Sequence, residues 1–298
     1  MTILNILSLL ALLLVACAAN ESGLTLNRTR RLSNPLLNED TLHLGKYIVS
    51  IRTRTVHYFY GENHFCGGVI IAPQFVLTSA HCVINKSSRV LYPARILLVV
   101  AGTPDRLRYQ SGISFHSEVK KIFVPDNFTL RNEQDLAILR LKNQIPRDTD
   151  HIGIARLPYR RVEAGTICKV MGWGRLYEDG PISARLLHIS IMIADPITCL
   201  EMLGIKKEDL LCGSDENPDL AQLPCPGDRG DPLMQGDIVY GIVSYLVKCD
   251  DNILPSVYTE VFHSIEWIRW ILSTNVSNVY QVSLFLVYGG VVLNFLLI

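Results

Sequence analysis

The chain has 298 residues, of which 49% are hydrophobic and 19% are charged, and its 28 basic residues balance its 28 acidic residues. This composition indicates a packed globular protein with a substantial core and excludes a disordered chain. The sequence contains no Lys/Arg cluster with interleaved aromatic residues, so it also argues against nucleic acid as a partner.

Residues 1–18 form an apolar stretch without a charged side chain, which ends in Ala16-Cys17-Ala18. Small residues at alternating positions suit signal peptidase, so we predict a signal peptide at 1–18 and a mature chain that begins near Ala19. The alternative is an uncleaved membrane anchor, although the apolar run is short for a membrane span. Residues 19–44 are predicted to be a polar N-terminal segment.

Seven cysteines follow the predicted cleavage site, and four Asn-x-Ser/Thr sequences are candidates for glycosylation. The candidate asparagines are Asn27, Asn85, Asn127 and Asn275. Both features predict an oxidising, secretory route and an extracellular location.

Short runs of β-branched and aromatic residues recur along the chain with turn residues between them, which predicts a mainly β body. These runs are Tyr47–Ile51, Gly68–Ile71, Arg95–Val100, Leu136–Leu141 and Ile238–Val243. Only the segment from Val261 to Leu272 has helical spacing of its apolar residues, so one C-terminal helix is expected there.

Residues 279–298 carry no charge and are mostly Val, Leu, Phe and Ile, with small or polar residues before them. This pattern predicts a glycolipid-anchor signal, and therefore attachment to the cell surface. A short retained membrane span and a segment packed against the domain are the alternatives.

The strongest local pattern is Cys66-Gly-Gly-Val-Ile70 followed by Leu77-Thr-Ser-Ala-His-Cys82, which places a histidine beside a cysteine on the turn after a buried strand. Such a histidine can be held rigidly as a general base. Asp135 stands at the head of the apolar strand Asp135-Leu-Ala-Ile-Leu139, where its carboxylate could orient His81 and stabilise its charged form.

Further motifs follow in order: Met171-Gly-Trp-Gly174, Cys225-Pro-Gly-Asp-Arg-Gly-Asp-Pro232, Gly241-Ile-Val-Ser-Tyr245 and Pro255-Ser-Val-Tyr-Thr259. With these motifs, residues 45–274 resemble the chymotrypsin/trypsin (S1) family of serine proteases. The resemblance implies an all-β fold of two packed six-stranded antiparallel β-barrels followed by a C-terminal α-helix. It also implies that His81 is the general base, that Asp135 orients it, and that Ser244 hydrogen-bonds to Asp135.

The chain departs from the family at the nucleophile motif, where Gly-Asp-Ser-Gly-Gly-Pro is replaced by Gly227-Asp-Arg-Gly-Asp-Pro232. A protonated guanidinium has no lone pair for attack on a carbonyl, so Arg229 in place of serine predicts that the protein is not an enzyme. We expect Arg229 either to pair with Asp228 or Asp231, or to reach into solvent from the cleft. The N-terminal segment also lacks the family's Ile-Val-Gly-Gly activation sequence.

By the same resemblance, the specificity pocket is expected to be obstructed, because larger or charged residues stand at its base and walls. These residues are Leu223, Leu246, Lys248 and Ser256. The implied disulfides are Cys66–Cys82, Cys199–Cys212 and Cys225–Cys249. Cys168 is left over and is expected to be a buried free thiol or a link to another chain.

The resulting hypothesis is an insect-type, secreted pseudoprotease that binds one or more extracellular proteins through the loops around the former cleft. Relatives of this kind act as cofactors, decoys or regulators in protease cascades, immunity and reproduction. The alternatives are a structural or adhesive surface protein, and an enzyme that uses residual chemistry of His81 and Asp135. No metal site or cofactor is predicted.

Overall fold

The computed structural model describes residues 43–275, apart from residues 86, 130–132, 147–148, 178, 205–206, 218–222 and 245–254. Several predictions therefore lie outside the described residues. They concern the signal peptide, the polar segment up to residue 42 with Asn27, the pocket residues Leu246 and Lys248, Cys249, and the tail 279–298. None of the described helices is both long enough and apolar enough to cross a membrane.

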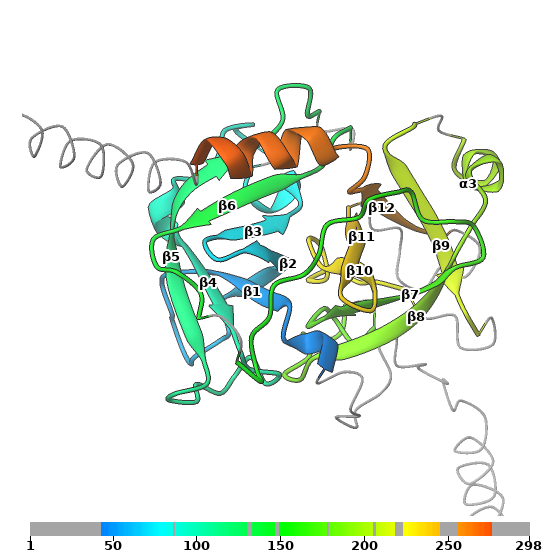
Figure 1. The fold of residues 1–298 in the computed structure, drawn as a ribbon. Helices are drawn as coiled ribbons and strands as arrows, with labels where there is room; N and C mark the ends of the chain where they lie inside the picture. The colour runs from blue at the N-terminus through cyan, green and yellow to red at the C-terminus, as the bar shows by residue number, and fades with distance from the viewer. Residues whose placement is uncertain are drawn as a thin grey trace, which may run out of the picture.

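The first half of the described chain forms a closed antiparallel barrel with the strand order β1-β2-β3-β6-β5-β4 (Figure 1). Its strands are β1 (Ile48–Thr53), β2 (His64–Ala72), β3 (Phe75–Thr78), β4 (Leu97–Ala101), β5 (Phe115–Phe123) and β6 (Ala137–Leu141). Apolar side chains from all six strands fill the interior, as β-branched residues that alternate along a strand are expected to do.

The second half forms another closed antiparallel barrel, with the order β10-β11-β12-β9-β8-β7. Its strands are β7 (Ile167–Gly172), β8 (Leu187–Ile193), β9 (Leu210–Asp215), β10 (Pro232–Gln235), β11 (Ile238–Val243) and β12 (Ser256–Glu260). The α-helix α3 (Pro196–Leu203) connects β8 to β9, with Asp195 as its N-cap and Gly204 at its C-terminus. Two six-stranded barrels with a C-terminal helix confirm the predicted fold class.

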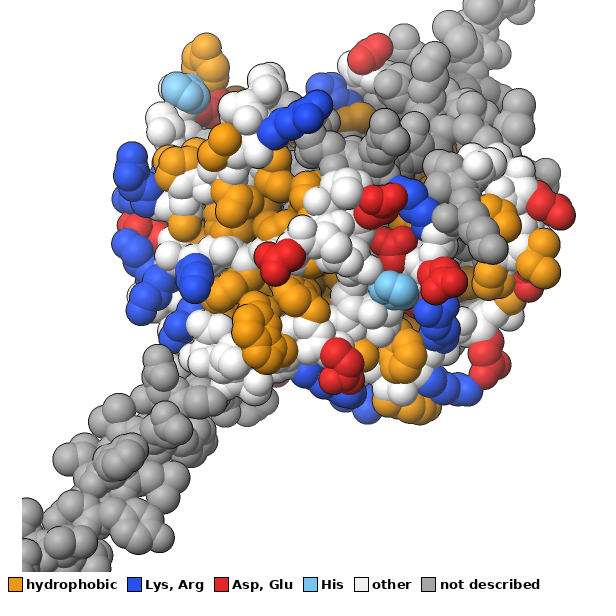
Figure 2. Space-filling model, turned by 90° about the horizontal axis from the view of Figure 1, so that it is seen from above, with side chains coloured by type: hydrophobic (Ala, Val, Ile, Leu, Met, Phe, Trp, Pro, Cys, Tyr) orange, Lys and Arg blue, Asp and Glu red, His pale blue; other side chains and the backbone are white. Residues whose placement is uncertain are grey.

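A separate apolar cluster joins the two barrels and the C-terminal helix, and it includes Tyr47, Trp173, Met234 and Ile268. The helix covers 265–275 rather than 261–272, because residues 261–264 form turns in which the amide of Ser264 donates to the carbonyl of Val261. Viewed from above, hydrophobic side chains gather on the side of the molecule where this helix lies, with Lys and Arg along the edge (Figure 2).

Candidate active site

His81 lies on the 3-10 turn η1 (Ala80–Cys82), directly after β3. Its backbone amide donates to the N-cap hydroxyl of Ser79 at 3.2 Å and to Asp135 Oδ1 at 3.0 Å. The neighbouring Cys82 is tied to β2 by its disulfide with Cys66. The cap and the disulfide together fix the turn that carries the imidazole.

Asp135 is completely buried and its carboxylate has several donors around it. His81 Nδ1 lies 3.0 Å from Oδ1, the hydroxyl of Ser79 donates to both oxygens at 2.8 Å, and the hydroxyl of Ser244 donates to Oδ2 at 2.5 Å. Burial acts to raise the pKa of Asp135, but the contacts with His81, Ser244 and Ser79 outweigh it, so the pKa lies below its ordinary value. Asp135 is therefore a stable anion beside the imidazole.

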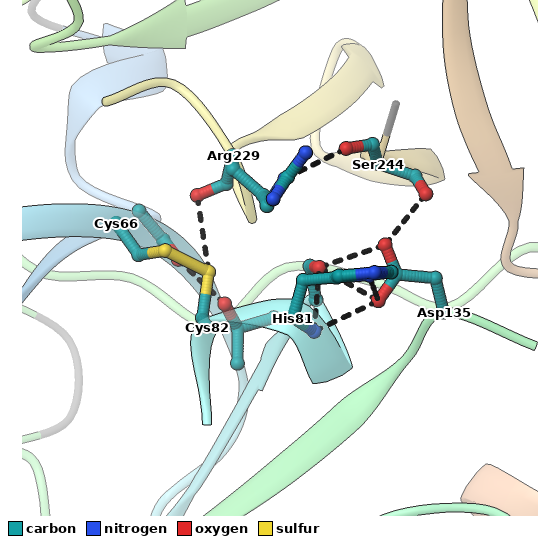
Figure 3. The surroundings of a disulfide bond; sticks show 9 residues. Cys66, His81, Cys82, Asp135, Arg229 and Ser244 are labelled. Carbon is teal, nitrogen blue, oxygen red and sulfur yellow. Dashed lines mark hydrogen bonds and ion pairs between the residues drawn. A yellow bond between two sulfur atoms is a disulfide. The ribbon is translucent and has the colours of Figure 1, made fainter. Parts of the chain in front are cut away.

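The structure brings Arg229 to the same place, on the turn before β10. Its Nε donates to the carbonyl oxygen of Ser244 at 2.8 Å, and its own carbonyl accepts from the amide of Gly67 at 2.9 Å. Figure 3 shows the guanidinium pointing toward Ser244, above the His81–Asp135 pair. A guanidinium is a hydrogen-bond donor only, so what this side chain adds to the cleft is a positive charge and N–H groups.

The expected pairing of Arg229 with Asp228 or Asp231 is wrong, and so is the alternative that it reaches into solvent. In the described part of the chain its side chain is half-buried and bonded to the Ser244 carbonyl. Burial lowers the pKa of Arg229, while the negative charge of Asp135 raises it. The backbone carbonyl and the nearby Asp135 anion together explain why the guanidinium turns this way.

Asp228 and Asp231 are also completely buried, on the same turn. Asp228 Oδ1 accepts from the amide of Gly174 at 2.6 Å and Oδ2 accepts from that of Cys225 at 2.8 Å. A Cβ atom placed on Gly172 would lie 1.8 Å from Asp231 Oδ2 and 2.4 Å from Asp228 Oδ1, so the two carboxyl groups share one small space.

Burial raises the pKa of Asp228 to about 6. It raises the pKa of Asp231 well above the usual range, and the negative charge of Asp228 adds to this effect. Two carboxyl groups in one buried space cannot both ionise cheaply, so the pair holds a proton where a lone aspartate would have none.

An open pocket of about 510 Å³ adjoins His81 on the side of the first barrel. Aromatic and aliphatic side chains make up much of its wall, including Phe65, Tyr92 and Ile96. Asn85, one of the candidate glycosylation sites, also lines it, and its Oδ1 accepts from the amides of Ser87 and Ser88. The cleft next to the imidazole therefore offers a mostly apolar surface.

Two of the predicted specificity-pocket residues lie within the described residues. Leu223 is buried, with 6% of its surface exposed. Ser256 is equally buried and donates to the carbonyl of Gly213 at 2.9 Å, and its hydroxyl lies 2.7 Å from that of Tyr258. Both side chains are thus buried.

The cysteines lie as follows. Disulfides join Cys66 to Cys82 and Cys199 to Cys212. Cys225 is disulfide-bonded, although its expected partner Cys249 is outside the described residues. Cys168 is a buried free thiol, and burial raises its pKa to about 12, which makes it a poor nucleophile at neutral pH.

Of the other candidate glycosylation sites, Asn127 is exposed. Asn275 is half-buried on the C-terminal helix, and its side-chain amide donates to the carbonyl of Ile271 at 2.9 Å.

Sequence reasoning missed Ser79, which bonds to both oxygens of Asp135. Its position two residues before His81, where a serine often caps a helical turn, was the available signal.

A family model described as Trypsin matches residues 38–268. Granzyme M of Rattus norvegicus is 28% identical over 238 residues, which are 77% of this chain and 85% of that protein. Chymotrypsin-2 of Vespa crabro is 30% identical over 227 residues, which are 76% of this chain and 94% of that protein. A solved structure of human heparin binding protein has a TM-score of 0.65 at 24% identity and covers 78% of this chain and 93% of its own, which shows likeness of fold.

These relatives overturn the prediction that the protein is not an enzyme, because they bear the names of proteases and so point to a protease. Neither the structure nor the comparisons shows Arg229 as a replacement for a nucleophile. The match to the family model spans both barrels together with His81, Asp135 and the turn that carries Arg229, and we conclude that the chain belongs to the trypsin family.

Proposed function

We propose that this trypsin-like domain binds an extracellular protein in the part of its cleft that lies beside His81, and that it regulates that partner as a cofactor or decoy. The observation that carries the proposal is the apolar pocket of about 510 Å³ that Phe65, Tyr92 and Ile96 line. Pockets of this size with apolar walls and a few polar groups are the usual places where proteins hold a ligand.

Arg229 supports binding in the same cleft. Its guanidinium stands above the His81–Asp135 pair, where a polypeptide that enters the cleft meets a fixed cation (Figure 3). An arginine held by a backbone carbonyl loses little further freedom when a ligand carboxylate or carbonyl binds to it. We expect the partner to present an apolar side chain to the pocket and an acceptor group to Arg229.

The test is capture of the partner from extracellular fluid by the secreted full-length protein. Tyr92→Ala changes the wall of the pocket, while Tyr159→Ala serves as the matched control, because Tyr159 is 70% exposed and does not line this pocket. We expect the wild-type protein and Tyr159→Ala to retain the same partner and Tyr92→Ala to retain at least tenfold less. Equal capture by all three proteins would disprove binding at this pocket.

Proteolysis is the second candidate function, since the relatives are named as proteases and His81 Nδ1 lies 3.0 Å from Asp135 Oδ1, although these two atoms do not have hydrogen-bond geometry. In this reaction His81 would take a proton from an attacking water and pass it to the leaving amine, while Asp135 stabilises the imidazolium. Peptide hydrolysis by the wild-type protein that disappears in His81→Ala supports this function. Turnover that persists in His81→Ala comes from a contaminant and counts against it.

A further inference from the structure

A second concave site lies away from the cleft, on the second barrel. It is a cavity of about 400 Å³ between α3, the end of the linker that joins the barrels, and the ends of β9 and β12. Much of its wall is apolar and comes from Val162, Pro196, Ile197, Leu200, Leu203 and Leu211. Ile197 leaves 66% of its surface exposed. On the right of Figure 2, over the second barrel, hydrophobic and acidic side chains lie next to one another.

Glu260 lines this cavity although only 2% of its surface is exposed. It is the last residue of β12, where its backbone pairs with Gly241 of β11 and its amide donates to the carbonyl of Asp209 at 2.8 Å. The strand therefore fixes the side chain at the floor of the cavity. Both of its carboxylate oxygens are buried without a hydrogen bond to any described residue.

Among the described residues, Arg161 forms an ion pair with Glu260, in which its Nη1 lies 3.3 Å from Oε2 without forming a hydrogen bond. The side chain of Arg161 is 55% exposed, so water screens this ion pair and the guanidinium is free to move. Lys207 lines the cavity as well, and its ammonium nitrogen lies 3.9 Å from a carboxylate oxygen of Glu133.

Burial raises the pKa of Glu260, Arg161 partly opposes this effect, and the charge of Asp209 adds to it. A buried carboxylate without hydrogen bonds is costly, and a cation that donates two or three hydrogen bonds to it recovers much of that cost. No described residue therefore donates a hydrogen bond to the carboxylate at the floor of the cavity, while the apolar walls suit a hydrocarbon chain.

We propose that this cavity is a binding site for a lysine or arginine side chain of a partner polypeptide, with the charged end on Glu260 and the hydrocarbon stem against α3. Long cationic side chains bury their methylene groups on apolar surfaces and direct the charge to a polar group, which is the arrangement offered here. The site is distinct from the cleft beside His81, so it stands or falls independently of the proposed function.

A cation fits this cavity better than an anion does. An anionic ligand would bind to Arg161 or Lys207 and would bring its charge toward the buried Glu260. Two like charges close together in a poorly solvated space repel each other strongly. A cationic ligand instead displaces Arg161 into solvent, which costs little for a side chain that is already more than half exposed.

Three probes with five carbon atoms each and different polar ends distinguish these possibilities: pentylamine, pentanol and pentanoate. We would titrate each into the full-length protein and follow the methyl NMR signals of Ile197 and Leu200. We expect pentylamine to bind with a Kd of about 1–10 mM, as suits so small a ligand. Pentanol should bind at least tenfold more weakly. Preferential binding of pentanoate would overturn the proposal.

Two variants locate the charge that is recognised. Glu260→Gln keeps the shape of the side chain and is expected to weaken pentylamine binding at least tenfold. Arg161→Ala alters an exposed residue, so the fold should persist, and binding should stay equal or become tighter because a competitor is removed. Weaker amine binding in Arg161→Ala contradicts the proposal even where Glu260→Gln does not fold.

A peptide pair tests whether the natural occupant is a polypeptide. Acetyl-Leu-Lys-Leu-amide should shift the same methyl signals with a lower Kd than pentylamine, while the matched peptide with norleucine in place of lysine should bind at least tenfold more weakly. Failure of the lysine peptide to bind where pentylamine does would restrict the site to small amines and refute the polypeptide part of the proposal.

Discussion

The protein has two buried acidic regions, and the pKa values of their carboxyl groups are shifted in opposite directions. At the first, Asp135 accepts from Ser79 and Ser244 and contacts His81, and its pKa is lowered. At the second, Asp228 and Asp231 share one space, and their pKa values are raised. All three carboxyl groups are fully buried. Because all three are buried, the donors around each carboxyl group and the charge of its neighbour decide whether it is ionised.

The largest expected loss of stability is at Asp135 and its partners Ser79, Ser244 and His81, which we call the donor-rich region. Asp135→Ala leaves the hydroxyls of Ser79 and Ser244 without their acceptor and removes one of the two acceptors of the His81 amide, in a place that water does not reach. An unsatisfied buried donor costs about 1–3 kcal/mol, so we expect a loss of about 3–5 kcal/mol of unfolding free energy. Urea unfolding at pH 7 measures it.

Asp135→Asn is the matched control, since it keeps one acceptor oxygen and removes the charge. We expect it to cost about 1–3 kcal/mol, less than the alanine variant. A loss below about 1 kcal/mol in Asp135→Ala would contradict the account of this region, because it would mean that the donors find other partners.

The next largest expected change in stability concerns Asp228 and Asp231, the acid pair, and it depends on pH. The pKa of Asp228 is about 6 in the folded protein against 3.8 as its ordinary value, so the folded state holds the proton more tightly. The stability that this proton contributes is complete below pH 4 and is lost as the pH rises through 6. Asp231→Asn replaces a carboxyl group whose pKa is raised well above its usual range, so the folded state no longer has to hold a proton there at a cost, and the variant should be more stable than the wild type by about 1–3 kcal/mol at pH 8. Urea unfolding of both proteins at pH 4 and pH 8 tests this, and the difference should nearly vanish at pH 4.

Gly67 provides an independent check on where Asp231 lies. A Cβ atom on Gly67 would come 1.5 Å from Asp231 Oδ1, so Gly67→Ala should destabilise the wild-type protein by about 1–3 kcal/mol. In the background of Asp231→Gly the same change should cost much less, because the obstructing carboxylate is gone. Equal costs in both backgrounds would place Asp231 elsewhere.

The sequence predicts the donor-rich region far better than the acid pair. His81 and Asp135 stand at the ends of strands whose apolar patterns are clear, and the barrel fold brings those ends together. The meeting of Asp228 with Asp231 depends on a tight turn, in which the amide of Asp231 donates to the carbonyl of Asp228 and Gly227 and Gly230 adopt positive φ. Sequence spacing does not specify which way such a turn directs its side chains.

Residues with long side chains were also beyond sequence reasoning. Arg229 was expected near its neighbours in the chain, but its partner is a carbonyl 15 residues away that only the fold brings close. In the sequence, Glu260 is an ordinary charged residue that follows the apolar and polar residues Val257–Thr259. The neighbouring residues in the sequence do not indicate that both of its carboxylate oxygens are buried. Tertiary contacts decide where such side chains point.

The smallest change in stability is expected at Arg229, which lies on the turn of the acid pair and donates from its side chain to the Ser244 carbonyl. Arg229→Ala loses one hydrogen bond to the Ser244 carbonyl. It also removes a guanidinium whose charged form is disfavoured by burial, as its lowered pKa indicates. The two effects nearly cancel, so we expect a change within about 1 kcal/mol in urea unfolding at pH 7. Arg229→Met keeps the stem and should give the same result, which separates charge from packing. A loss of about 3 kcal/mol in both variants would instead reveal a buried ion pair, and its partner would be Asp135, the anion whose charge raises the pKa of Arg229.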